Sequence, residues 1–532
     1  MSPLLLSNGN GIRMGNGNGV HKQEPPLERA AEVEDLIDAV KSIIVPYIRD
    51  ADEASADRAQ GQIPERNVLV DSLSLRPEEL VKQLRFTLPE GEGQGKDGLL
   101  DTIQDVLKYS VNTWDQGFMD KLYSSTNAVG VVSELLLGVL NTNLHVYHTS
   151  PSLTVVEKTT ARAMAALFGL TGPRAGGVTC QGGSSSNLTS LIIARNTLYP
   201  KTKVQGNAGY KFAVFTSIHG HYSVEKAATI AGIGSRSVIT VAVDSEGRMD
   251  PAALQQAIEG AKEKGMTPLY VNATAGTTVM GSFDPFIQIA DICENFGMWM
   301  HVDGSWGGPV AFSAKQRYKI AGAERANSVT VNPHKMMNVP VTCSFLLTND
   351  VSVFHRANTL PAGYLFHDDD DHVPANGCGR GDGEIGEKEV WDLADLTLQC
   401  GRRGDSLKLA LAWIYYGAAG FEKQVDHAFE MASHFATLVD ENEDFVLVSS
   451  NPPPCLQVCF YYAPAGVLDS DAEVNTSRTK TVVRKLVDRG FMTDYAPGPF
   501  GSFIRVVINC QTRKSTVEGL MRALKESGDE TV

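Results

Sequence analysis

The sequence predicts an α/β protein with a large part built on a mainly parallel sheet and a smaller α+β part after it. With 532 residues, the chain is too long for one hydrophobic core. Between about residues 150 and 350, short β-rich runs alternate with helical stretches, which is typical of a parallel sheet covered by helices on both faces. After about residue 400, a long helical segment is followed by strand-like runs and a closing helix.

Four segments follow from this pattern. Residues 1–26 are rich in Gly and Asn and have too few apolar residues to offset the entropy of ordering, so we expect a disordered tail. Apolar residues then recur at helical spacing, as in Val33, Leu36, Ile37 and Val40, which predicts a helical segment over 27–149. We expect the large domain over 150–400 and the small α+β domain over 401–532.

The expected strands are short runs of β-branched and aromatic residues. In the large domain they lie at 212–215, 238–242, 269–271 and 298–302, and in the small domain at 445–448, 457–461 and 503–507.

Charge and composition exclude several classes of partner. A formal net charge of −15 argues against nucleic acid and anionic membrane surfaces, although it leaves room for a small anionic substrate in a locally basic pocket. The apolar run at 3–6 is too short for a signal peptide, and the one at 128–140 is too short to span a bilayer. The eight cysteines form no CxxC pair and no metal-finger spacing, as in a reducing compartment. We expect a soluble, cytoplasmic protein.

Two residues suggest covalent chemistry with an aldehyde. Lys335 lies in the polar segment Asn-Pro-His-Lys (332–335), and a lysine becomes nucleophilic when burial or a nearby cation lowers its pKa. Asp303 follows the strand-like run 298–302, which would deliver one carboxylate from a buried strand. A lysine that condenses with an aldehyde, paired with an acid for a pyridinium nitrogen, is the minimal pattern of a pyridoxal phosphate enzyme.

Other segments fit the same chemistry, each with an ordinary alternative. Gly182 and Gly183, with Ser184 and Ser185, precede a helical run and could bind a phosphate, or form an ordinary loop and helix cap. His221 could stack on a flat ring, or be a structural histidine. The segment 272–278 follows a strand and offers hydroxyls where α/β sheets bind ligands.

The order of three motifs resembles one family closely. Asn-Ala-Thr-Ala-Gly-Thr-Thr-Val (272–279), Ser-Val-Thr-Val-Asn-Pro-His-Lys-Met-Met (328–337) and Ala-Gly-Tyr-Leu-Phe (362–366) are similar to the group II pyridoxal phosphate-dependent amino-acid decarboxylases. The resemblance runs from about Asp101 to about residue 525 and is strongest to the branch of glutamate, cysteine sulfinate and aspartate decarboxylases. It implies a fold-type I enzyme, similar to aspartate aminotransferase.

The resemblance also implies a role for individual residues. Lys335 would bind the cofactor aldehyde, Asp303 would pair with the ring nitrogen, and His221 would stack on the ring. Arg505 would bind the substrate α-carboxylate, unless it is a structural strand arginine. Thr277 would lie near the ring. The phosphate would be bound by Ser184, Ser185, Asn332 and His334.

Tyr364 matches the loop tyrosine that protonates the substrate carbon in this family. The run His-Asp-Asp-Asp-Asp-His (367–372) follows it; we interpret it as a solvated loop and assign no metal.

The positions that contact the substrate side chain in the family differ here from the glutamate enzymes. Asn143 matches, but Lys121, Tyr123 and His145 replace Gln, Ser and Phe. Tyr123 would shorten the pocket, and Lys121 would neutralise a distal acid or point to solvent. His148 replaces a usual Glu, and Gly304 stands where we expect an alanine beneath the ring.

We therefore expect a homodimeric α-decarboxylase of a small acidic L-amino acid. Aspartate and cysteine sulfinate are favoured, and glutamate is possible. The alternatives are a decarboxylase of a non-acidic amino acid or of an amino acid of specialised metabolism, a related pyridoxal phosphate-dependent oxidative deaminase or lyase, and a non-catalytic scaffold homologue.

Overall fold

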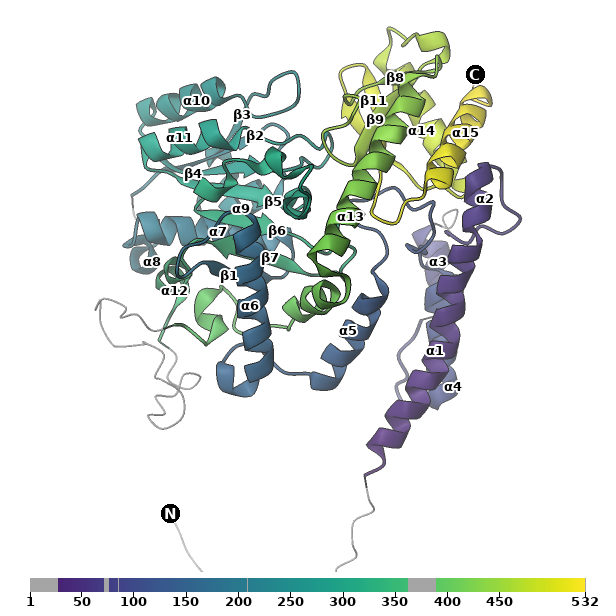
Figure 1. Ribbon diagram of the computed structural model, residues 1–532, viewed down its shortest axis with the longest axis horizontal. Coiled ribbons are helices and arrows are strands. Elements are labelled where there is room, and N and C mark those ends of the chain that lie inside the picture. Colours follow the sequence, from purple (N-terminus) through teal and green to yellow (C-terminus); the bar gives the residue numbers. More distant parts are fainter. Residues whose placement is uncertain (1–26, 71–75, 85, 208, 362–388, 532) are drawn as a thin grey trace, which may run out of the picture.

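Two sheets organise the chain in the computed structural model, which describes residues 27–70, 76–84, 86–207, 209–361 and 389–531 (Figure 1). The larger sheet has seven strands in the order β1-β7-β6-β5-β4-β2-β3, and the smaller has four in the order β10-β11-β9-β8. The expected disordered tail, 1–26, lies outside the described residues.

The large sheet is mainly parallel, as predicted. Pairs β2/β3, β2/β4, β4/β5 and β5/β6 are parallel, and only β7 is antiparallel to its neighbours β1 and β6. Its strands are β1 (Gly176–Cys180), β2 (Phe212–Ser217), β3 (Val238–Val241), β4 (Thr267–Thr274), β5 (Trp299–Gly304), β6 (Ser328–Val331) and β7 (Ser344–Thr348).

Both faces of this sheet are buried, because successive side chains enter different cores. Ala213 and Phe215 of β2 pack in one apolar cluster with residues of α10 (Pro251–Glu263) and α11 (Phe286–Phe296). Val214, between them, packs in another with residues of α7 (Gly183–Leu198), α9 (Ser223–Ile230) and α12 (Ser352–Asn358). Helices therefore cover the sheet on both sides.

One edge of the sheet collects the functional residues. Because β7 is antiparallel to both β1 and β6, β1 runs in the same direction as the parallel strands. The carboxyl ends of β1, β2, β4, β5 and β6 therefore lie at one edge, where open α/β sheets bind ligands.

The small sheet is antiparallel throughout and packs with the longest helix, α13 (Ser406–Asp440), which is broken at Gly417 (φ 69°, ψ 169°). Its strands and flanking helices are β8 (Phe445–Leu447), β9 (Gln457–Tyr462), α14 (Ala472–Asp488), β10 (Asp494–Gly498), β11 (Gly501–Val507) and α15 (Lys514–Asp529). All seven expected strands are present. The expected strands did not include β1, β6, β7 or β10. In β10, Pro497 and Gly498 lower the strand propensity.

Helix α2, near the N-terminal end of the described residues, packs against the C-terminal helix. In Figure 1, α2 (purple) lies beside α15 (yellow), while α1 extends away from it alongside α4. The contact is close, since a Cβ at Gly519 would come 1.8 Å from the Arg58 carbonyl oxygen. Arg58 also forms a fully buried, bidentate ion pair with Asp115, at 2.9 Å for each hydrogen bond.

The remaining elements are short or peripheral. The N-terminal region contains α1 (Arg29–Glu53), α2 (Ser55–Gln60), α3 (Pro77–Leu84), α4 (Gly95–Lys108) and α5 (Ala128–Leu140), followed by α6 (Pro151–Leu167) and α8 (Thr202–Gln205). Single 3₁₀ turns occur at Tyr147–Thr149, Ser235–Ser237, Gly308–Phe312, Arg317–Ile320, Ala323–Arg325, Leu393–Leu396 and Pro464–Gly466. Within the described ranges, no helix is both long and apolar enough to cross a bilayer.

Candidate active site

A cavity of about 280 Å³ lies at the carboxyl edge of the large sheet. Its walls include six residues predicted from the sequence: Ser184, His221, Asp303, Asn332, His334 and Lys335. These residues come from four separate segments of the chain, and the sheet topology brings them together.

Lys335 lies in the turn that follows β6, where its backbone N–H donates to the Asn332 carbonyl oxygen at 3.0 Å. Burial disfavours the ammonium form and lowers the pKa of Lys335, although Asp303 acts in the opposite direction. A lysine with a lowered pKa offers a larger fraction of neutral, nucleophilic amine.

Asp303, near the end of β5, is buried but remains a carboxylate. Burial tends to raise its pKa, but nearby Ser305, His301, Asn187 and Lys335 together hold the pKa below its ordinary value. The Asn187 side-chain amide donates to Asp303 Oδ2 at 2.8 Å, and the Ser305 backbone N–H donates to Oδ1 at 3.1 Å. A charged acid here suits a cationic ring nitrogen.

Asn187 connects Asp303 to a buried histidine. Its Oδ1 lies 3.1 Å from His301 Nε2, while His301 Nδ1 lies 2.8 Å from Ser328 Oγ. Burial lowers the pKa of His301 to about 4, so the imidazole is neutral at pH 7. The neutral ring fixes the Asn187 amide, which in turn orients the Asp303 carboxylate.

His221 lies between β2 and α9 on another wall of the cavity. Burial lowers its pKa, opposed by Asp303 and reinforced by Lys335 and Lys226. Its ring centroid lies 4.5 Å from that of Tyr222, at an interplanar angle of 50°. A neutral imidazole of this kind is suited to stacking on a flat aromatic ring.

The start of α7 provides an anion site. Gly182 has a φ of 85°, and the helix begins at Gly183, so its first backbone N–H groups are left without helical partners. Ser184 lines the cavity, as do Asn332 and His334. Burial lowers the pKa of His334 to about 4, and its Nδ1 lies 2.7 Å from the Cys343 carbonyl oxygen. Ser185, also predicted here, is not among the lining residues.

Thr277 does not line the cavity either. Its side chain is fully buried, and its Oγ1 accepts a hydrogen bond from the Ser282 backbone N–H at 3.0 Å. The adjacent Thr278 lines the cavity instead.

Arg505 contacts Thr278, which lines the cavity, but is not itself among the lining residues. Its Nη1 donates to the Thr278 carbonyl oxygen at 3.0 Å, and its Nη2 donates to Asp120 O at 3.1 Å and to Asp494 Oδ2 at 2.8 Å. Arg505 is 6% exposed, and its buried Nε has no hydrogen-bond partner among the described residues. The Nε–H is therefore a buried donor that no described residue accepts.

Lys121 lies beside Arg505. Its Nζ donates to the same Asp494 Oδ2, at 3.0 Å, and to Asp120 Oδ1, also at 3.0 Å. Burial tends to lower the pKa of Lys121, but Asp494 and Asp120 outweigh it and raise the pKa. Lys121 is thus a fixed cation in a cluster with Arg505.

The other positions predicted to contact the substrate side chain lie away from the cavity. Tyr123 is 42% exposed and packs on Phe118. Asn143 accepts a hydrogen bond from the Arg402 backbone N–H at 2.9 Å, and His145 Nδ1 lies 3.0 Å from the Val146 backbone nitrogen. His148 is exposed.

The expectation that Gly304 stands beneath a bound ring is wrong. A Cβ at Gly304 would come 2.9 Å from the Thr330 carbonyl oxygen and 3.2 Å from Gly308 Cα, so this position faces the neighbouring backbone. Ser305, one residue later, lines the cavity. Because side chains alternate along a strand, a shift of one residue changes the face.

Two predictions concern residues that the structure does not describe: Tyr364 and the acidic run 367–372 both lie within 362–388. Within the described ranges, no group of three or more His, Cys, Asp or Glu side chains could hold a metal ion.

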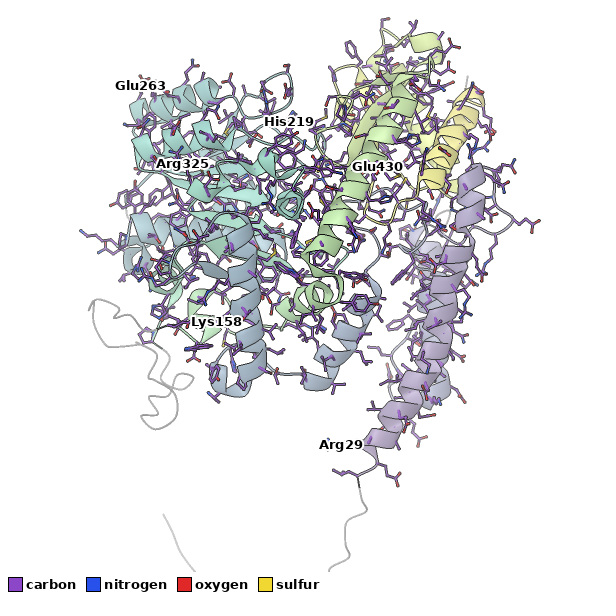
Figure 2. The ribbon with its side chains drawn as sticks, in the orientation of Figure 1. Arg29, Lys158, His219, Glu263, Arg325 and Glu430 are labelled. Atoms are coloured by element: carbon purple, nitrogen blue, oxygen red, sulfur yellow. The ribbon has the colours of Figure 1, made fainter. Side chains whose placement is uncertain are left out.

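A larger cavity of about 1330 Å³ adjoins the first and shares His221, Tyr222 and Thr278 with it. Its walls include Asp284, from the segment between β4 and α11, and Phe503, from β11 of the small sheet. His219, another wall residue, lies on the side of the large sheet that faces the small one (Figure 2). The larger cavity therefore adjoins the one that Lys335 lines.

These groups fit pyridoxal phosphate. The start of α7 and Ser184 suit the phosphate, Asp303 the ring nitrogen, and Lys335 the aldehyde. Gly183 is required for the close approach, because a Cβ there would come 2.5 Å from Ser305 Oγ and 2.8 Å from Asn332 Nδ2. The fold and site define the class of pyridoxal phosphate enzymes.

Comparison with known proteins assigns the family. Residues 77–463 match the model of the pyridoxal-dependent decarboxylase conserved domain, and the chain belongs to this family. It is 57% identical to the L-aspartate decarboxylase dtxS4 of Metarhizium robertsii, over 95% of this chain and 99% of that protein. It is 37% identical to a glutamate decarboxylase-like protein of Gibberella zeae, over 94% and 98%, respectively.

Solved structures have the same fold as this chain. The crystal structure of mouse CSAD superposes with a TM-score of 0.81 at 31% identity, covering 94% of this chain and 99% of that one. Oryza sativa TDC with PLP and tryptamine has the same TM-score at 22% identity, covering 96% and 99%, and supports the fold alone. The predicted fold class, pyridoxal phosphate cofactor and decarboxylase activity are confirmed.

The residues of the site that were not predicted include Asn187, Thr278, Ser305 and Asp494. Asn187 follows Ser184 by three positions on α7, so helical spacing could have placed both on one face. Ser305 and Asp494 carried no such pattern, because their roles depend on tertiary contacts.

Proposed function

We propose that this decarboxylase removes the α-carboxylate of L-aspartate as CO₂, leaving β-alanine. The observation that carries the proposal is the pair of cations beside the cofactor cavity: Arg505, held against Thr278, and Lys121, fixed next to it by Asp494. The 57% identity to an L-aspartate decarboxylase supports the same substrate.

Each side chain of the site has a separate role in this reaction. Arg505 orients the α-carboxylate through charge-assisted hydrogen bonds, and Lys121 attracts the second acid of the substrate. Lys335 binds the cofactor, Asp303 holds its ring nitrogen protonated, and His221 covers one face of the ring. When bound, pyridoxal phosphate would supply an electron sink for the breaking of the Cα–carboxylate bond. Tyr364 returns a proton to Cα.

The test is CO₂ release by the cofactor-loaded enzyme with aspartate, cysteine sulfinate, glutamate and an aromatic amino acid. We expect the highest kcat/KM for aspartate, with cysteine sulfinate second, because its sulfinate replaces the β-carboxylate at the same chain length. Glutamate as the best substrate would contradict the assignment of a short acid, and turnover of the aromatic alone would contradict the acidic class.

Two variants sharpen this experiment. R505Q should lower kcat/KM for aspartate by roughly 10²–10³-fold, because a charge-assisted carboxylate contact contributes a few kcal/mol. K121M should lower kcat/KM for aspartate by a smaller factor than R505Q does. It should also reduce the ratio of kcat/KM for aspartate to that for alanine, since only the contact with the distal acid is lost. An unchanged preference would remove Lys121 from the substrate site.

We also propose that the enzyme is a homodimer. The support is α5, whose exposed apolar side chains include Val132 (61% exposed), Leu135 (49%) and Val139 (68%), a surface that a second copy would cover. The loop with Asn143 and His145 follows α5, so the same contact would bring it to the partner. V132E/V139E should yield a smaller, inactive species in size-exclusion chromatography; an unchanged dimer would contradict the use of this face.

The proposal places the enzyme in the cytoplasm. Its support is that the seven described cysteines are all free thiols, as in a reducing compartment.

A further inference from the structure

Ser305 presents a hydroxyl to the cofactor cavity that is left without a partner. The residue is 8% exposed and lines the cavity together with Asp303 and Lys335. Its Oγ has no hydrogen-bond partner among the residues that the structure describes. A buried hydroxyl without a hydrogen bond costs free energy, so such groups usually receive a partner from a ligand or water.

The position of this hydroxyl lies between two parts of the site. On one side, the Ser305 backbone N–H donates to Asp303 Oδ1 at 3.1 Å. On the other, Ser305 Oγ faces the start of α7, since a Cβ at Gly183 would come 2.5 Å from it. The hydroxyl therefore lies between the acid for the ring nitrogen and the backbone N–H groups for the phosphate.

We propose that the Ser305 hydroxyl binds the cofactor directly, donating a hydrogen bond to its phosphate group. Phosphate oxygens only accept hydrogen bonds, and the groups already at this anion site are backbone N–H groups and the side chains of Ser184, Asn332 and His334. Ser305 adds a donor from the opposite wall. Its effect is to hold the phosphate end of the cofactor in register with Asp303. This role is independent of which amino acid is decarboxylated.

The chain offers a matched control. Thr330, on the neighbouring strand β6, is fully buried, and its Oγ1 also has no hydrogen-bond partner among the described residues. It does not line the cavity. T330V and S305A therefore each remove one buried hydroxyl, but only S305A removes one that faces the cofactor.

The experiment titrates the apo forms of the wild type, S305A and T330V with pyridoxal phosphate and, separately, with pyridoxal. Visible absorbance gives Kd, and thermal unfolding with and without ligand gives an independent readout. We expect S305A to bind pyridoxal phosphate about three- to ten-fold more weakly, the effect of losing one hydrogen bond, with a smaller ligand-induced rise in Tm. Binding of pyridoxal, which lacks the phosphate, should be unchanged.

Apo S305A should unfold close to the wild-type temperature, because the Ser305 hydroxyl makes no hydrogen bond of ordinary geometry to the described residues, and T330V should keep the wild-type Kd. Equal affinity of S305A and wild type for pyridoxal phosphate would overturn the proposal. The proposal would also be overturned if S305A lost the same factor of affinity for pyridoxal, or if T330V lost the same factor of affinity for pyridoxal phosphate. Either result would show that S305A had removed no specific phosphate contact.

Discussion

Lys335 and Asp303 share one cavity, but burial affects their charges differently. For Lys335, burial lowers the pKa and favours the neutral amine. For Asp303, hydrogen bonds from Ser305 and Asn187 and the proximity of His301 and Lys335 overcome burial and preserve the carboxylate. The site thus keeps one nucleophile neutral and one acid charged at the same pH.

The first prediction concerns Lys335. K335A should abolish turnover and the visible absorbance of the bound cofactor, because no other amine lines this part of the cavity in the described chain. K262A, an exposed lysine on α10, should keep both. CO₂ release by K335A at the wild-type rate would remove Lys335 from the chemistry.

The second prediction concerns the pH dependence of stability. His301 has a folded-state pKa of about 4 against an ordinary value of 6.5. Between these values, the unfolded chain binds a proton here that the folded chain excludes, so stability is lost as pH falls. We expect the free energy of unfolding of the wild type to fall relative to that of H301Q by about 1.4 kcal/mol per pH unit over this window.

The measurement is chemical denaturation of both proteins from pH 7 to 4. Burial raises the pKa values of Asp284 and Asp395 to about 6, which acts in the opposite direction, but both groups are common to the two proteins and cancel in the comparison. Parallel stability curves would show that His301 is not excluded from protonation.

At the scale of elements, the site is a junction between strand ends and one helix start. Strands β5 and β6 deliver Asp303 and the turn with Lys335, while β1 leads into Gly182 and α7. Helix α7 must approach closely for its first N–H groups to reach the cavity and for the Asn187 side chain to reach Asp303 and His301. The absence of a side chain at Gly183 permits this approach.

The third prediction tests that approach. In G183A, the new methyl group would displace the Ser305 hydroxyl and the Asn332 amide, so we expect pyridoxal phosphate affinity to fall at least about ten-fold while the fold is kept. Gly260 on α10 is the control, because a Cβ there meets nothing within 4 Å. G260A should bind normally and be more stable by up to about 1 kcal/mol. Equal cofactor affinity of G183A and G260A would contradict the argument.

Sequence reasoning succeeded where chemistry and pattern coincide and failed by single residues elsewhere. Lys335 and Asp303 could be predicted because the two together form the minimal pattern of a pyridoxal phosphate enzyme, and because the motif around Lys335 resembles the family. Ser305 and Thr278 were missed in favour of their neighbours Gly304 and Thr277, since which side of the backbone faces a cavity depends on strand register. Asp494 could not be found, because it lies on β10, whose Pro and Gly conceal the strand.

At the scale of the whole molecule, contacts between distant segments hold the N-terminal helices in place. Arg58 of α2 and Asp115 form their ion pair with both side chains fully buried, and α2 packs on α15. These contacts connect α2 to α15, a helix of the same C-terminal part of the chain as β11, which supplies Arg505.

The fourth prediction tests this connection. R58A should lower the free energy of unfolding by about 3–5 kcal/mol, because it leaves the Asp115 carboxylate buried without its partner. R66A, which removes an exposed ion pair with Asp50, should lower it by no more than about 1 kcal/mol. Urea denaturation of the holoenzyme measures the free energy of unfolding of both variants. Equal decreases would show that the buried ion pair contributes no more to stability than the exposed one.

The packing of α2 on α15 also sets an order of events during biosynthesis. Arg522 of α15 donates to the carbonyl oxygen of Ala59, 463 positions earlier in the chain. A nascent polypeptide therefore carries its N-terminal helices without their partner until α15 has left the ribosome, long after the strands of the large sheet have been made. For that interval the surface meant for α15 is open to chaperones or to misassembly with another chain.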